Sequence, residues 1–370
     1  ALEGEPLKLS IDLTVQAATR QVLKDGMRLM NAKGASAILM DVNTGEIISL
    51  VSLPDFDPNN RPRAAILGDP SENPLFNRAA QGLYELGSTF KIFTAATSLE
   101  KGLVNPQTII DTTPFRWNRK TYKDYKNYGP TNSVEDIIMK SSNVGTIRMA
   151  LAAGTSAQKK TLKDLGFFEA VPVELGEASR TKPQIPKNWS DTSTITISFG
   201  HGISATPLHL ATAYSIVANG GFRVKPTIKK IDFGNLSREQ VISPKTSQQL
   251  ISMLRRVVSE KDGTAKMAKV EGYEVAGKTG TAEKIKPTGG YYDDKVIATF
   301  ASIFPASDPK YTLVVSLDEP EIEVYGKNRR TSGYTSVPVA AEIISRVAPI
   351  LNLRPIVPNN KMTYTSISSQ

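Results

Sequence analysis

The stretch Glu85-Leu-Gly-Ser-Thr-Phe-Lys91 brings a glycine, a serine and a lysine together directly before a run with helical periodicity, residues 92–99. If Ser88 opens that helix, Ser88 and Lys91 lie three positions apart on one face, within reach of each other. The free N–H groups of the helix N-terminus would also point toward Ser88. The spacing therefore indicates a nucleophile, a nitrogen base and the start of an anion site. An ordinary N-cap serine with a solvated lysine produces the same pattern, so this stretch alone does not decide between them.

The composition narrows the chemistry that the chain can support. Its 370 residues suffice for one large domain or two small ones, and 40% hydrophobic residues can form a sizeable core. No apolar run approaches the ~18 residues of a membrane span, and no signal peptide is recognisable. The absence of cysteine excludes disulfides and thiolate nucleophiles. With only two histidines, His201 and His209, a multi-histidine metal site is not expected, nor is any cofactor.

The net charge of +9 is spread over the chain in small clusters. These clusters are not interleaved with stacking aromatic residues, so nucleic acid is not an expected partner. The charge favours an anionic surface or polymer, and a merely solvated basic face remains the alternative. His201 lies between two glycines and is expected to have a structural role, whereas His209 is expected on a helix surface.

The order of predicted elements indicates an α/β fold with a large helical insertion. Residues 36–52 read as a hairpin that turns at 43–45, and its strands are apolar on both faces, which is typical of strands buried beneath helices. Helical character dominates from 88 to 253, and the aromatic-rich insert 107–130 is expected to be a packed hairpin rather than a glycan-binding face. The hairpin and the C-terminal strands form one sheet only if the chain ends meet. The other elements are predicted helices at 11–30, 207–217, 243–258 and 337–351, and predicted strands at 274–281, 296–304 and 311–317.

Two further segments bear on whether residues 85–91 are catalytic. Ser141-Ser-Asn143 lies within residues 138–145, and Lys278-Thr-Gly280-Thr281 ends a predicted strand. Ser-x-x-Lys, a Ser-Asp-Asn element and Lys-Thr-Gly, in this order, form the signature of penicillin-binding proteins and class A β-lactamases. In this chain Ser142 stands where the second element has aspartate, which points away from class A. From about residue 7 to residue 355 the chain resembles the transpeptidase domain of class B penicillin-binding proteins, in particular the division-specific septal enzymes of Gram-negative bacteria.

The resemblance implies a fold and a division of the chain. The fold is the penicillin-binding/β-lactamase-like transpeptidase fold, α/β plus all-α, with an antiparallel sheet flanked by helices. Residues 1–370 are then a single transpeptidase domain, with an α/β subdomain at about 7–52 and 267–355 and a mainly helical subdomain at about 53–266. The membrane anchor and the pedestal domain of such proteins are expected to be absent from this chain.

Physical chemistry and the resemblance together suggest a role for each motif residue. A serine nucleophile needs a base, and a lysine can act as one near neutral pH only if burial or a neighbouring cation lowers its pKa. The resemblance implies that the strand of Lys278 runs beside the helix of Lys91 and provides such a cation. It also implies an oxyanion hole made by the backbone N–H groups of Ser88 and Thr281. The expected catalytic residues are Ser88, Lys91, Ser141, Asn143 and Lys278, and the expected substrate-binding residues are Thr279, Gly280 and Thr281.

The resemblance implies a peptidoglycan D,D-transpeptidase that cross-links stem peptides during septal wall synthesis and is acylated by β-lactams. Its expected location is the periplasmic face of the inner membrane, where it meets lipid II-derived glycan, a separate glycosyltransferase and divisome proteins. A β-lactamase or β-lactam sensor, a D,D-carboxypeptidase and a non-catalytic wall-binding module remain as alternatives. Hydrolysis of β-lactams would need a deacylating glutamate, and the glutamates at 169, 174 and 177 lack the class A pattern.

Overall fold

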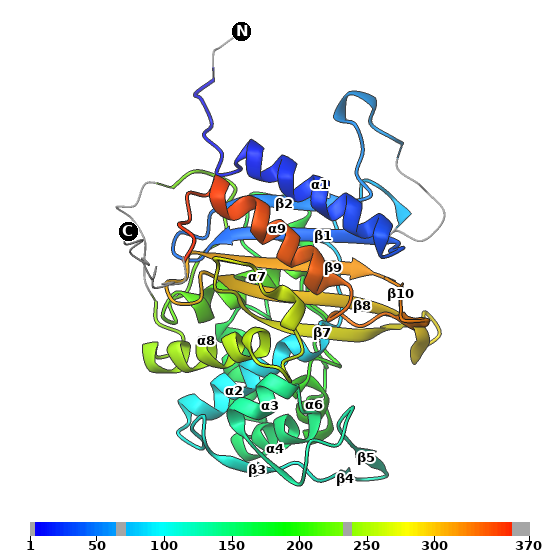
Figure 1. Ribbon diagram of the computed structural model, residues 1–370, viewed down its shortest axis with the longest axis vertical. Helices are drawn as coiled ribbons and strands as arrows, with labels where there is room; N and C mark the ends of the chain where they lie inside the picture. The colour runs from blue at the N-terminus through cyan, green and yellow to red at the C-terminus, as the bar shows by residue number, and fades with distance from the viewer. Residues whose placement is uncertain (1–3, 64–71, 232–238, 357–370) are drawn as a thin grey trace, which may run out of the picture.

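The computed structural model describes residues 4–63, 72–231 and 239–356. At its centre lies a five-stranded antiparallel sheet with the strand order β2-β1-β9-β8-β7 (Figure 1). Because β1 pairs with β9, the two ends of the chain meet in one sheet, which confirms the predicted fold class. The strands are β1 (Gly34–Asp41), β2 (Ile47–Leu53), β7 (Ala276–Ile285), β8 (Tyr291–Phe304) and β9 (Tyr311–Asp318).

Strand β1 lies in the interior of the sheet and explains the apolar character of its sequence. Ile38 faces Leu50 of β2 and Val314 of β9 in the register. Every residue of β1 except Asp41 is buried, as expected for a strand that is covered on both faces. The hairpin turn forms at the predicted place, because the Asp41 carboxylate accepts hydrogen bonds from the backbone N–H groups of residues 43 and 44.

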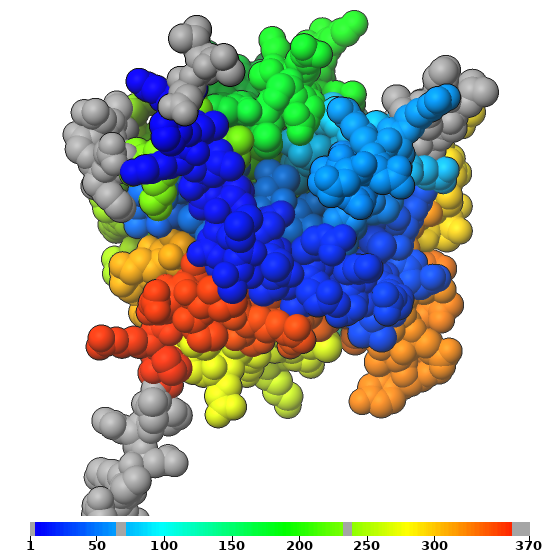
Figure 2. Space-filling view, turned by 90° about the horizontal axis from the view of Figure 1, so that it is seen from above, coloured from blue at the N-terminus to red at the C-terminus, as the bar shows by residue number. Residues whose placement is uncertain are grey.

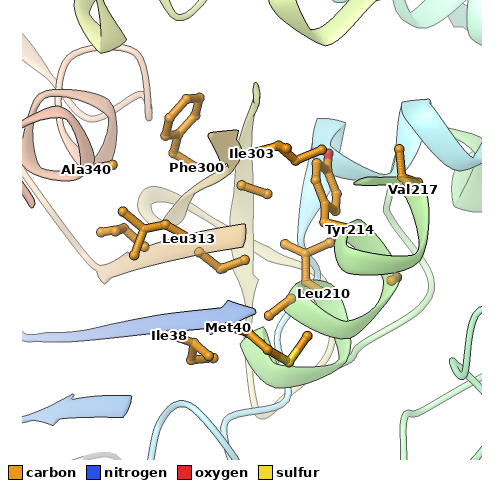
Figure 3. Close-up of a cluster of buried hydrophobic side chains, with 14 of the residues drawn as sticks. Ile38, Met40, Leu210, Tyr214, Val217, Phe300, Ile303, Leu313 and Ala340 are labelled. Carbon is orange, nitrogen blue, oxygen red and sulfur yellow. The ribbon is translucent and has the colours of Figure 1, made fainter. Parts of the chain in front are cut away.

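Helices cover both faces of this sheet. Helices α1 (Leu13–Leu29) and α9 (Ser336–Ile350) lie side by side on one face (Figures 1 and 2), and α7 (Pro207–Ala218) packs against the other. Figure 3 shows Ala340 of α9 and Tyr214 of α7 approaching the strands from opposite sides. Removal of these apolar side chains from water, at roughly 25 cal/mol per Å², provides the driving force for the layered arrangement. All three helices fall within about two residues of their predicted bounds.

The remaining helices form a region beside the free edge of β7. Helix α8 packs along β7 and against α2, and α2 in turn contacts α4 and α5. The helices are α2 (Lys91–Glu100), α3 (Val134–Lys140), α4 (Asn143–Ala153), α5 (Thr155–Asp164), α6 (Asp191–Ser198) and α8 (Pro244–Ser259). The short strands are β3 (Ile109–Asp111), β4 (Phe115–Trp117), β5 (Lys120–Tyr122), β6 (Thr131–Ser133), β10 (Ile322–Val324) and β11 (Lys327–Arg329).

The aromatic-rich insert 107–130 contains the expected hairpin. Strands β4 and β5 pair antiparallel, and Tyr122 is buried against Ile147 and Ile195 of the helical region. Tyr125, in contrast, is 84% exposed. The insert therefore packs through Tyr122, with Phe115 and Trp117 against the same cluster, while Tyr125 faces solvent.

The predicted subdomain boundaries stay a prediction. Helix α7 belongs to the stretch 53–266 in sequence, yet it packs on β9 and β1. The helical stretch thus contributes one face of the sheet layer as well as the region beside β7. Within the residues that the structure describes, no helix combines the length and apolar character needed to cross a bilayer.

Candidate active site

The nucleophile candidate Ser88 lies in a tight turn that leads into a helix. Residues Gly87–Phe90 form the 3₁₀ helix η3, and α2 starts directly after it at Lys91. In a 3₁₀ helix the side chains at i and i+3 eclipse each other, so Ser88 and Lys91 lie along one edge. The turn is anchored from behind, because the buried hydroxyl of Tyr214 on α7 donates a hydrogen bond to the carbonyl of Thr89 at 2.9 Å.

Two close backbone approaches hold the middle of β7 against this turn, and a third holds Gly200, which follows α6, against it. A Cβ atom on Gly280 would lie 2.3 Å from the carbonyl oxygen of Leu86, and one on Gly87 would lie 2.8 Å from that of Thr281. A Cβ atom on Gly200 would lie 2.0 Å from the carbonyl oxygen of Gly87. Only glycine permits such distances, so Gly280 and Gly87 fix how closely the edge strand approaches Ser88.

The three sequence motifs converge on the hydroxyl of Ser141. Lys91 Nζ lies 3.1 Å from Ser141 Oγ and 2.6 Å from the Ser141 carbonyl oxygen. Lys278 Nζ lies 2.9 Å from the same hydroxyl. Both lysines are almost completely buried, with 1% and 0% of their surface exposed. Ser141 reaches them from the turn between α3 and α4, where its φ of +64° places it in the left-handed region.

Burial changes the protonation of both lysines. It lowers the pKa of Lys91 from 10.5 to about 7, and the negative charge of Asp124 acts in the opposite direction. Burial also lowers the pKa of Lys278 well below its ordinary value, and the charge of Lys91 lowers it further. The sequence suggested Lys278 as the cation that activates Lys91, but burial is the principal cause of the lowered Lys91 pKa. Near neutral pH a substantial fraction of Lys91 is therefore a free amine that can accept a proton.

The two residues after Ser141 have different surroundings. Ser142 is buried and caps α4, since its hydroxyl accepts a hydrogen bond from the N–H of Gly145 at 3.0 Å. Asn143 is half-buried, and its side-chain amide makes no hydrogen bond within the described residues. That amide is therefore available to a ligand, to which it can both donate and accept.

The two threonines of the third motif are held by residues that the sequence analysis did not identify. The hydroxyl of Thr279 lies 2.8 Å from that of Thr264, and the hydroxyl of Thr281 accepts a hydrogen bond from the N–H of Ser332 at 3.0 Å. Asp124, which contacts the Ser141–Asn143 turn, was not predicted as a site residue either. No spacing pattern links these three residues to the motifs, so only the folded chain reveals them.

The two histidines lie in different environments. The expectation that His209 sits on a helix surface is wrong, because only 3% of the residue is exposed. Its Nε2–H donates to the carbonyl of Glu169 at 2.9 Å, its Nδ1 lies 2.7 Å from the hydroxyl of Thr206, and burial lowers its pKa to about 4. Helix α7 is buried all round, so it has no solvent-facing side on which His209 could lie. His201 pairs with Glu283 of β7 at 3.3 Å, and its structural role stays a prediction.

The comparisons with known proteins agree with this architecture. The penicillin binding protein transpeptidase domain family matches residues 35–345. The chain is 35% identical over 350 residues to the peptidoglycan D,D-transpeptidase FtsI of Escherichia coli K12, covering 94% of this chain and 57% of that protein. It is 34% identical over 360 residues to the probable peptidoglycan D,D-transpeptidase FtsI of Caulobacter vibrioides, covering 95% of this chain and 60% of that protein.

A solved structure shows the same fold. The transpeptidase domain of Burkholderia pseudomallei penicillin-binding protein 3, in its apo form, superposes with a TM-score of 0.83 at 30% identity. The match covers 96% of this chain and all of that one, at 100%. Fold and motif residues thus define a penicillin-binding transpeptidase domain. The chain belongs to the penicillin-binding protein transpeptidase family, and its relatives are of the FtsI and penicillin-binding protein 3 type, of whose full length it spans only about 60%.

Proposed function

We propose that the chain is the catalytic domain of a peptidoglycan D,D-transpeptidase that works through an acyl-enzyme on Ser88. The observation that carries this proposal is the hydroxyl of Ser141, which lies between the buried amines of Lys91 and Lys278, at 3.1 and 2.9 Å. Such a hydroxyl can pass a proton between an amine base and a leaving group. The arrangement supplies acid–base chemistry to a serine nucleophile without a histidine.

In the first half-reaction, Ser88 Oγ attacks the carbonyl carbon of the D-alanyl–D-alanine amide while the neutral amine of Lys91 takes the hydroxyl proton. A bond forms between Ser88 and the carbonyl carbon, and the carbonyl electrons move onto oxygen. The backbone N–H groups of Ser88 and Thr281 are the proposed donors to that oxyanion. When the amide C–N bond breaks, the Ser141 hydroxyl donates its proton to the departing D-alanine nitrogen and regains one from Lys91.

In the second half-reaction, the amine of a neighbouring stem peptide attacks the acyl carbon. Its proton moves through Ser141 to Lys91, the new amide forms, and the ester bond to Ser88 breaks. The Ser88 oxygen recovers a proton from Lys91, which closes the cycle with Lys91 neutral again. A β-lactam enters the same first step, but its leaving nitrogen stays tethered to the acyl group.

The free edge of β7 is the proposed donor-binding surface. In the sheet β7 pairs only with β8, so its outer edge presents backbone groups to which an extended peptide can add. Thr281 of β7 and Asn143 at the start of α4 are half-exposed. The proposed receptors for the terminal carboxylate are Lys278 with the hydroxyls of Thr279 and Thr281, and the proposed receptor for the peptide backbone is the Asn143 amide.

The FtsI-type relatives support a proposal for the wider role. We place the activity in septal wall synthesis on the periplasmic face of the inner membrane. A separate glycosyltransferase would polymerise the lipid II-derived glycan, and divisome proteins would be partners. The +9 net charge is consistent with work on an anionic polymer.

A β-lactamase of the same fold is less well supported. The carboxylate of Glu174 accepts hydrogen bonds from Thr227 Oγ1 and the N–H of Ile228, and that of Glu177 accepts one from Asn77. Both therefore hold loops together. A hydrolase needs such a carboxylate free to activate water for deacylation, so neither Glu174 nor Glu177 suits that role.

The test is labelling with a fluorescent penicillin, followed by mass-spectrometric mapping of the modified peptide. We expect one adduct on Ser88 that persists over the time of the assay. Turnover of benzylpenicillin within seconds would favour a β-lactamase instead. Absence of any adduct on Ser88 would favour a wall-binding module. A donor thioester offered with and without an acceptor amine then separates transpeptidation from carboxypeptidation.

A further inference from the structure

The carboxylate of Asp124 holds the turn that carries Ser141 and Asn143. Asp124 Oδ1 accepts hydrogen bonds from the backbone N–H groups of Asn143, at 2.6 Å, and Val144, at 3.0 Å. Asp124 Oδ2 accepts one from the hydroxyl of Ser142 at 2.6 Å. A side chain from the loop after β5 thus binds the first two backbone N–H groups of α4 and the hydroxyl of its N-cap residue, Ser142.

Together, Asp124 and Ser142 satisfy the first N–H groups of α4. Asp124 binds two of them, and Ser142 Oγ accepts the third from Gly145 while donating to Asp124. Unsatisfied donors at a helix N-terminus destabilise it, and replacing a cap typically costs about 0.5–2 kcal/mol. The carboxylate also suits the positive end of the helix dipole.

The two serines of the turn contact different groups. Ser141, in the left-handed conformation, reaches Lys91 and Lys278, whereas Ser142 reaches Asp124. A displacement of the α4 N-terminus would therefore move the Ser141 hydroxyl relative to both amines. The hydrogen bonds to Asp124 therefore influence the distances along the proposed proton path.

Asp124 owes its own position to the β4–β5 hairpin. Tyr122, two residues before it, is buried in a cluster with Ile147 of α4 and Ile195 of α6, and Phe199 packs against the same cluster. Tyr122 is thus the packing anchor that brings the Asp124 carboxylate to α4.

The charge of Asp124 also faces the lysine pair. Among the described residues, Lys278 of β7 and Asp124 are the charged groups that interact electrostatically with Lys91. Asp124 favours the protonated form of Lys91 and so limits the fall in pKa that burial causes. On the loop side, Tyr128 and Tyr125 adjoin Asp124, and the pKa of Tyr128 is raised by burial and by the Asp124 charge.

We propose that Asp124 is a positioning residue for the reaction: it fixes the Ser141–Asn143 turn and thereby holds the Ser141 hydroxyl between the amines of Lys91 and Lys278. It acts through α4 and through the lysine, and the proposal does not require contact with the substrate. The inference deepens the proposed function and rests on it, since it concerns the same proton path.

Two substitutions separate the geometric part from the electrostatic part. Asp124→Ala removes the acceptors as well as the charge, and acylation by fluorescent penicillin at pH 8 should fall about 10²-fold. Asp124→Asn keeps a cap-competent oxygen for the two N–H groups but removes the charge. At pH 8 it should acylate within about threefold of the unmodified protein, and its pH–rate midpoint should move to lower pH. Asp111→Asn, a change in the same insert at a carboxylate that pairs with Arg148, should change neither quantity.

A second readout does not depend on penicillin. The ¹³Cε resonance of Lys91 in the lysine-labelled protein reports its titration directly, and Asp124→Asn should shift that titration to lower pH. Unchanged acylation in Asp124→Ala with a native circular dichroism spectrum would overturn the positioning role of Asp124. An unshifted titration in Asp124→Asn would overturn its effect on the charge of Lys91. Failure of penicillin to label Ser88 in the unmodified protein would instead overturn the proposed function, because the Lys91 titration is read without any acyl donor.

Discussion

The centre of the sheet and the lysine pair are equally buried, but they bury opposite kinds of side chain. Ile38, Phe300 and Leu313 have no exposed surface in the sheet layers, and Lys278 has none either. Burial of the apolar groups stabilises the fold. Burial of the amines disfavours their charged forms and lowers the pKa of Lys91 to about 7. The same exclusion of water thus produces stability in one region and a base in the other.

The substitution Lys91→Ala is the strongest test of the difference between the sheet core and the lysine pair. Loss of a general base should reduce the rate of acylation by fluorescent penicillin by roughly 10²- to 10⁴-fold. Because a buried amine contributes little to folding, the melting temperature should not fall appreciably. Lys101→Ala provides the control, since Lys101 lies at the far end of α2 and donates to the carbonyl of Ala153. Acylation of Lys91→Ala at the unmodified rate would remove Lys91 from its role.

The sheet should respond in the opposite way. Leu313→Ala leaves a cavity between the sheet and its helices and should lower the free energy of unfolding by about 2–5 kcal/mol. The acylation rate of the folded protein should stay within about twofold, because the site lies on the other side of β8 and β7. Denaturant titration measures the first quantity. Leu29→Ala, at a residue that is 68% exposed, should cost less than about 0.5 kcal/mol. Equal losses for both variants would contradict the assignment of the core.

Gly280→Ala tests the contact between β7 and the turn that carries Ser88. The new Cβ atom would lie 2.3 Å from the Leu86 carbonyl oxygen, so β7 and the nucleophile turn must separate. A misplacement of this kind should reduce acylation about 10²-fold. Gly176→Ala is the matched control, because nothing lies within 4 Å of its Cβ position. An unchanged acylation rate in Gly280→Ala would show that the close approach is not needed.

The pH dependence is the most graded test. Acylation requires neutral Lys91, so its rate should rise about tenfold per pH unit below about 7 and level off above it. Stability should follow a different course. The folded pKa of Lys91 lies below its ordinary 10.5, so the unfolded chain binds more protons between about 7 and 10.5. This group therefore makes the free energy of unfolding fall as the pH drops through that window, with no further change below it.

Lys91→Met should remove that contribution, which can be measured by denaturant titration at pH 7 and pH 10. A rate that is flat from pH 5 to pH 8 in the unmodified protein would contradict neutral Lys91 as the base. A stability difference between the two pH values that is unaffected by Lys91→Met would contradict the lowered pKa.

Much of the layout can be read from periodicity and turn chemistry. The doubly apolar strands of the hairpin predict burial on both faces, and β1 is buried accordingly. The amphipathic pattern of α1 and the Pro207 start of α7 place those helices within about two residues. His209 was misplaced because a helix that is buried all round has no polar face, so a lone polar residue in it carries no directional signal.

By itself the sequence determined the order of strands and helices, the three motifs and the absence of any thiol or histidine-rich chemistry. These are local properties of residue type and spacing. The tertiary structure alone decided that Lys91 and Lys278 share the Ser141 hydroxyl, that burial lowers the Lys91 pKa, and that Asp124 caps α4. Each of these depends on distances and on the exclusion of water between segments far apart in the chain, and no local pattern encodes either.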